Sequence, residues 1–65
     1  MKTGRNIAFA RKVNGMTQKE LAARVGISRE YLASIEAGKE RPSKRVLARI
    51  AVELGVDIGN FMENK

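Results

Sequence analysis

This 65-residue chain contains few of the side chains that enzymes use for catalysis. It contains no Cys and no His, and its only Asp is Asp57, so no Ser-His or Cys-His pair can form. Glu36, considered as a catalytic acid, has no partner for such chemistry nearby in the sequence. The usual zinc ligands, a Walker-type phosphate loop and a GxGxxG stretch are all missing. We therefore expect neither an enzyme nor a metal or cofactor site.

The basic side chains are the stronger signal. Thirteen Lys and Arg residues against seven Asp and Glu residues give a net charge of +6. Residues 1–49 hold 12 of the basic residues but only 4 of the acidic ones. Such a balance suggests a polyanionic partner, most often nucleic acid, although a merely soluble surface is the alternative.

The sequence shows neither a membrane segment nor an export signal. No apolar run approaches the roughly 18 residues of a membrane span. The N-terminus lacks the apolar stretch of a secretory signal. We expect a cytoplasmic protein with no membrane partner and no small-molecule substrate.

Helices must position these side chains, since apolar residues recur with helical spacing and no segment alternates like a strand. Five helices are predicted, roughly over residues 4–14, 18–25, 29–37, 44–54 and 58–62. Thr17 and Glu20 form a capping box at the start of the second helix. Glycines follow the first four stretches, where left-handed caps are wanted: Gly15, Gly26, Gly38 and Gly55. The result is an all-α protein with a single domain over residues 1–65.

Residues 17–38 carry the most specific pattern. Two short helices meet at a turn of about three residues around Gly26, and the small Ala22 leaves room for the second helix. Five apolar positions lock the pair at a wide angle: Leu21, Val25, Ile27, Leu32 and Ile35. The pattern predicts a helix-turn-helix whose second helix enters the DNA major groove, with an ordinary helical hairpin as the alternative.

The same stretch resembles the Xre/Cro-type helix-turn-helix family of phage and bacterial regulators. A TQxxLA start, a GxS turn and an IExG ending stand at residues 17–22, 26–28 and 35–38. The similarity extends to Arg11, to Arg41-Pro42-Ser43, to Ile50-Ala51 and to Leu54-Gly55-Val56. The resemblance implies a compact five-helix, lambda-repressor-like DNA-binding domain that usually works as a dimer, its helix-turn-helix formed by helices 2 and 3.

The resemblance also implies which residues touch DNA. Bases would be read from the first turn and a half of the recognition helix, here Arg29, Glu30, Ala33 and Ser34. Arg29 suits guanine, Glu30 a cytosine amine and Ala33 a thymine methyl. The expected phosphate contacts are Thr17, Gln18, Lys19, Tyr31, Lys39, Arg41, Lys44 and Arg45. For Tyr31, packing against the helix pair is equally open.

The positions of Lys44 and Arg45 indicate a phosphate-binding role independently of the family resemblance. They stand at the N-terminus of a predicted helix, where the macrodipole disfavours cations. A nearby phosphate would explain this placement, and a tolerated surface choice is the alternative.

Further residues are expected to stabilise the fold or to bind a partner protein. The resemblance implies an ion pair between Arg11 and Glu36. Phe9 and Val13 make an apolar pair, for which core packing and a partner surface both remain open. The apolar C-terminal part would close the core and supply a dimer surface: Val52, Val56, Ile58, Phe61 and Met62.

Two function classes follow. The first is a sequence-specific transcriptional regulator of double-stranded DNA, such as a minimal repressor, Cro-like protein or restriction controller, binding a near-palindromic operator as a homodimer. The second is an antitoxin-type protein-interaction module on the same fold, whose main task is to hold a partner toxin. For either class, the protein partner considered is a toxin or a polymerase. The basic first 49 residues favour the first class, whereas the Phe9–Val13 pair and the apolar tail keep the second open.

Overall fold

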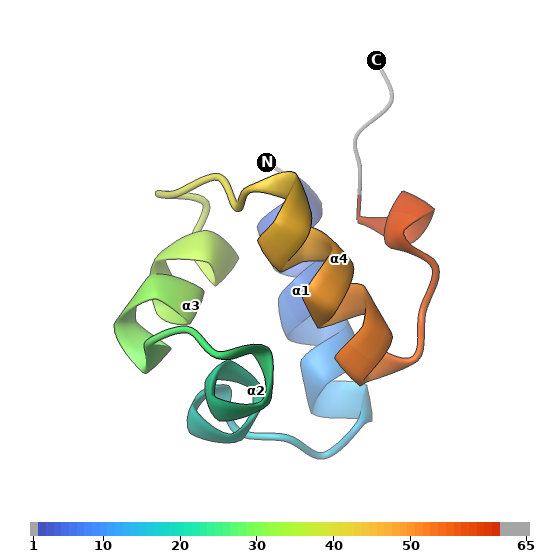
Figure 1. Ribbon diagram of the computed structural model, residues 1–65, viewed down its shortest axis with the longest axis horizontal. Helices are drawn as coiled ribbons and strands as arrows, with labels where there is room; N and C mark the ends of the chain where they lie inside the picture. The colour runs from blue at the N-terminus through green and yellow to red at the C-terminus, as the bar shows by residue number, and fades with distance from the viewer. Residues whose placement is uncertain (1, 62–65) are drawn as a thin grey trace.

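A computed structural model describes residues 2–61 of the chain (Figure 1), which form four α-helices, one short 3-10 helix and no strand. The elements are α1 Lys2–Val13, α2 Gln18–Val25, α3 Arg29–Glu36, α4 Lys44–Leu54 and the 3-10 helix η1 Ile58–Asn60. The all-α expectation is confirmed, and the first four helices lie within two residues of their predicted ends. No helix among the described residues is long and apolar enough to cross a bilayer.

Local capping chemistry sets the helix ends. The Thr17 hydroxyl accepts a hydrogen bond from the Glu20 backbone N–H at 3.0 Å, and the Glu20 carboxylate accepts the Thr17 N–H at 2.9 Å. This capping box begins α2 where the sequence predicts it. Gly26 ends α2 with a left-handed φ of 87°, which is why the chain can turn there without strain.

The predicted fifth helix is wrong in type and length. η1 is three residues long, and the Phe61 N–H closes it on the Ile58 carbonyl at 3.0 Å. The Asp57 carboxylate accepts the Gly59 N–H at 3.2 Å, which favours a tight turn over an α-helix. Gly59 also opposes an α-helix here, because glycine costs about 1 kcal/mol in a helix interior. Met62 lies outside the described residues.

All four α-helices and the segment after η1 contribute to one core. Its fully buried side chains come from α1, α2, α3 and α4, and Figure 1 shows α1 behind α4 with α3 at the left. The buried apolar residues are Ile7, Leu21, Ala22, Leu32, Ile35, Leu47, Ile50, Ala51, Leu54 and Phe61. In this packing α2 contacts α3 and α4, and α3 contacts α1.

The start of α1 is fastened to two distant segments. A Cβ at Gly4 would overlap the carbonyl oxygen of Ile35, so only glycine allows α1 to approach the last turn of α3 this closely. The Thr3 hydroxyl donates a hydrogen bond to the carbonyl of Phe61. Thus α1 contacts both the end of α3 and the segment that follows η1.

Candidate nucleic-acid interface

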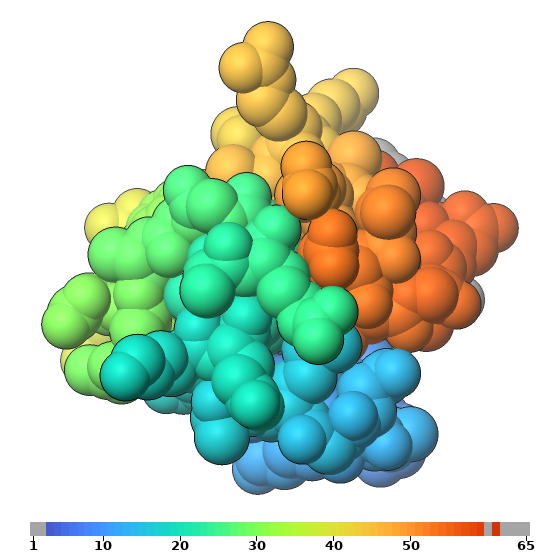
Figure 2. Space-filling view, turned by 60° about the horizontal axis from the view of Figure 1, so that its bottom comes forward, coloured from blue at the N-terminus to red at the C-terminus, as the bar shows by residue number. Residues whose placement is uncertain are grey.

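The turn between α2 and α3 occupies the three residues predicted for it. The N–H groups of Gly26 and Ile27 both donate to the Ala22 carbonyl, at 2.8 and 3.0 Å. The Ser28 hydroxyl then accepts the Tyr31 N–H at 3.0 Å and starts α3. In the space-filling view this turn lies beside α4 on one face of the molecule (Figure 2). The Ala22 carbonyl and the Ser28 hydroxyl therefore hold the turn through local hydrogen bonds.

One side of α3 is buried and the other is accessible. Leu32 and Ile35 face the core, and because an α-helix repeats every 3.6 residues, three of the residues expected to read bases lie on the opposite side and Arg29 lies at its edge. Arg29 and Glu30 are exposed, whereas Ala33 and Ser34 are half-buried. They are thus brought together on one surface.

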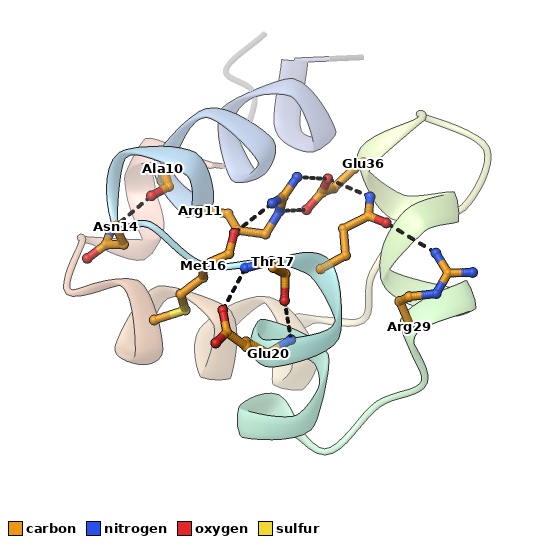
Figure 3. Close-up of polar contacts among 9 residues, drawn as sticks. Ala10, Arg11, Asn14, Met16, Thr17, Glu20, Arg29 and Glu36 are labelled. Carbon is orange, nitrogen blue, oxygen red and sulfur yellow. Dashed lines mark hydrogen bonds and ion pairs between the residues drawn. The ribbon is translucent and has the colours of Figure 1, made fainter.

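Arg11 and Glu36 form the expected ion pair between α1 and α3. Arg11 Nε lies 2.8 Å from Glu36 Oε2, and Arg11 Nη2 lies 3.1 Å from Glu36 Oε1 (Figure 3). The two side chains are only 10% and 7% exposed. Arg11 Nη1 also donates to the Met16 carbonyl at 2.8 Å. Such bidentate geometry satisfies two buried charges together.

Gln18 connects this pair to the predicted base reader, which the sequence did not suggest. Its Nε2 donates to Glu36 Oε1 at 3.0 Å, and its Oε1 accepts from Arg29 Nη1 at 3.2 Å. A carboxylate only accepts and a guanidinium only donates, so the two neighbours fix which way the amide points. The contacts Arg11–Glu36–Gln18–Arg29 therefore run unbroken from α1 to the exposed end of α3 (Figure 3).

The expected phosphate contacts fall into three groups. Thr17, Gln18 and Lys19 lie at the start of α2, but the Thr17 hydroxyl is used by the helix cap and the Gln18 amide by Glu36 and Arg29. Tyr31 is half-buried against the core, as its packing alternative predicts. The remaining four are exposed and lie between α3 and α4 or in the first turn of α4: Lys39, Arg41, Lys44 and Arg45.

The predicted dimer surface does not form one surface. Phe61 is only 2% exposed and belongs to the core, so its assignment to a dimer interface is wrong. Val52 is 71% exposed and lines a groove with the turn between α2 and α3. Val56 lines a different groove, beside α1, and Ile58 is half-buried against the core. The residues were expected to act together, but α4 and the turn after it point them to different sides.

Metal ligands do not gather anywhere in residues 2–61: no three His, Cys, Asp or Glu side chains lie close enough together to hold an ion. The interface instead offers hydrogen-bond donors and positive charge.

A family model described as helix-turn-helix matches residues 7–61. The chain belongs to the helix-turn-helix family. This confirms the resemblance to Xre/Cro-type regulators. The helix-turn-helix protein is 43% identical over 53 residues to an uncharacterized HTH-type transcriptional regulator of Sinorhizobium fredii, covering 82% of this chain and 69% of the regulator. It is 38% identical over 58 residues to the immunity repressor protein of Bacillus phage phi105, covering 89% of this chain but only 40% of the repressor.

A solved structure supports the same fold. The restriction-modification controller protein C.AhdI from Aeromonas hydrophila superimposes on the helix-turn-helix protein with a TM-score of 0.89. The alignment covers 94% of this chain and 92% of that protein, at 24% sequence identity. At this identity the likeness establishes the fold alone.

Proposed function

We propose that this helix-turn-helix protein is a DNA-binding transcriptional regulator that reads a specific operator through α3. The single observation that carries the proposal is the outward side of α3, where Arg29 is exposed yet held by Gln18 at 3.2 Å. An exposed guanidinium on a projecting helix can reach the edge of a base in the major groove. The names of the relatives, regulators and a phage repressor, support the same function.

Arg29 is the principal base reader in this proposal. Its guanidinium has five N–H donors, of which one is bonded to Gln18, so a pair remains for guanine O6 and N7. Glu30 lies 3.7 Å from Arg29 and accepts from the cytosine amine of a neighbouring base pair. Ala33 contacts a thymine methyl group, and Ser34 adds a hydrogen bond with little sequence information.

Phosphates on either side of the groove fix the position of α3. Lys39 and Arg41 follow the recognition helix, and Lys44 and Arg45 stand in the first turn of α4, which has no acidic residue. At the start of α2, Lys19 and the second N–H of the Gln18 amide contact the phosphate backbone of the DNA. These contacts supply affinity without sequence preference.

The regulator binds as a homodimer in this proposal, because one recognition helix covers too few base pairs to define an operator. Two-fold related helices bind half-sites about 34–36 Å apart. The protein measures 31 × 23 × 19 Å, so two copies in contact can span that distance. Val52 is the most exposed of the interface residues that the structure describes, and Arg49 and Glu53 beside it offer both charges to a second copy.

Selection of bound sequences from a random DNA pool, at fixed salt, tests the proposal. We expect a near-palindrome with half-site centres about 10–10.5 base pairs apart. Arg29→Ala should remove the preference for one guanine in each half-site and weaken operator binding by about 1–3 kcal/mol per half-site. Non-specific DNA affinity should stay nearly unchanged. Arg24→Ala, an exposed arginine of α2 outside the expected contacts, is the matched control. One asymmetric motif, with base preferences unchanged in Arg29→Ala, would refute both the dimer and the reading helix.

A protein partner is the second candidate, favoured by one observation. Phe9 and Val13 are 71% and 69% exposed, so the core-packing role left open for Phe9 does not hold. Neither residue belongs to the expected DNA contacts. A protein-binding role is therefore compatible with DNA binding rather than an alternative to it.

A further inference from the structure

An apolar groove of about 310 Å³ runs beside α1. Phe9 and Val13, four residues apart and hence on one side of the helix, form one wall. Ala10, Val56 and Phe61 complete its apolar lining. Only three large apolar side chains among the described residues are exposed, and two of them stand at this groove. Single exposed apolar residues are ordinary, but their convergence on one groove indicates a binding surface.

The charged residues of α1 beside the groove have one sign, and the facing segment, residues 55–61, contains a single acidic residue, Asp57. Arg5 and Lys12 are exposed and stand four residues before and three residues after Phe9, which places them on the same side of α1. The helix contains no acidic residue. An occupant that contacts this part of α1 therefore gains from Asp or Glu beside its apolar side chains.

A second copy of this chain fits the groove poorly. A two-fold interface places the same patch on both subunits. Arg5 and Lys12 of both copies would then meet at the contact, and the one carboxylate in α1 and residues 55–61 is Asp57, which already accepts the Gly59 N–H. Around Val52, by contrast, Arg49 and Glu53 form an ion pair at 3.1 Å and provide both charges. The α1 groove is therefore complementary to a different, acidic surface.

The groove is separate from the DNA-reading surface. No residue that lines it belongs to the expected base or phosphate contacts. The side of α1 that contains Gly4 and Arg11 packs against α3, whereas Phe9 lies on the exposed side. An occupant can therefore bind while α3 remains available to DNA.

We propose that this groove binds an acidic amphipathic helix of a partner protein. The partner helix inserts apolar side chains along Phe9 and Val13 and places carboxylates opposite Arg5 and Lys12. This is the helix-in-groove mode of recognition, in which apolar residues at helical spacing anchor the peptide.

The test uses the full chain and a synthetic amphipathic peptide of about 15 residues, with a leucine stripe at helical spacing flanked by glutamates. Nuclear magnetic resonance titration should shift amide signals of α1 and of residues 55–61, with or without DNA bound. Phe9→Ser should weaken binding by about 10-fold or more, because it removes an aromatic contact surface. Val52→Ser is the matched control, since Val52 is equally exposed but lines the other groove.

A second peptide, with lysine in place of every glutamate, isolates the role of charge. We expect it to bind at least about 10-fold more weakly, and the difference to shrink at high salt. Circular dichroism should show that Phe9→Ser folds normally, because the side chain is exposed. Equal binding of both peptides, no shifts in α1, or an equal loss in Val52→Ser would overturn the proposal. Self-association that Phe9→Ser abolishes would also overturn it, in favour of a second copy.

Discussion

Replacing Glu36 by alanine should largely unfold the protein. The Glu36 carboxylate accepts three hydrogen bonds, from Arg11 Nε at 2.8 Å, Arg11 Nη2 at 3.1 Å and Gln18 Nε2 at 3.0 Å. Without it, Arg11 Nη1 still donates to the Met16 carbonyl at 2.8 Å (Figure 3), but the buried Arg11 charge has lost its carboxylate partner. Removing one member of a buried pair costs about 3–5 kcal/mol. A domain of this size has a free energy of unfolding of about 3–10 kcal/mol, so the loss takes most of it.

Urea denaturation followed by circular dichroism measures this loss. Glu30→Ala is the matched control, because Glu30 is exposed and its 3.7 Å contact with Arg29 should contribute less than about 1 kcal/mol. The double variant Arg11→Met with Glu36→Leu should be more stable than Glu36→Ala, since an apolar pair of similar volume leaves no charge buried.

The double variant also separates stability from recognition. It should fold, yet its Gln18 amide has lost the carboxylate that orients it, so the preference for guanine opposite Arg29 should weaken. A loss below about 1 kcal/mol in Glu36→Ala would refute the reasoning, because the pair would then contribute no more than an exposed one.

Three further changes test other parts of the structure. Replacing Lys44 and Arg45 together by alanine should weaken binding to all DNA sequences alike, and should flatten the log–log salt slope by about 0.9 per lost phosphate contact; an unchanged slope would mean that they face solvent only. Gly4→Ala should cost about 1–3 kcal/mol in urea denaturation, because its Cβ overlaps a carbonyl of α3, whereas Gly59→Ala, whose Cβ meets nothing closer than 3.8 Å, should change stability far less. Phe61→Asp should abolish the helical circular dichroism signal, because it buries a charge in the core; a folded monomer would contradict that placement.

Features governed by neighbouring residues were predictable from the sequence. The capping box of Thr17 and Glu20 depends only on residues three apart, and Gly26 ends α2 because of its own backbone freedom. The apolar spacing that locks α2 against α3 is likewise a local pattern, and Leu21, Leu32 and Ile35 are buried as it requires. These signals sufficed to place the recognition helix.

Features that depend on how distant segments meet were not predictable. Phe61 is apolar and lies near the end of the chain, which suits a core or a dimer surface equally until the packing against the helices is known. Val52 and Val56 are four residues apart, but α4 ends at Leu54, so the helical spacing that would align them is broken. The bond from Gln18 to Arg29 depends on the angle between two helices, which spacing alone does not fix.

The hydrogen bond from Thr3 to Phe61 joins residues 58 positions apart and therefore closes most of the chain into a loop. Closing a long loop carries an entropy cost, which local helix formation does not share. Local opening of residues 55–61 would have to break this bond and withdraw Phe61 from the core. When they open, Phe61 leaves the core and Val56 leaves the groove beside α1. The lining of that groove thus exists only while the two ends of the loop stay together, and an occupant of the groove would hold them closed.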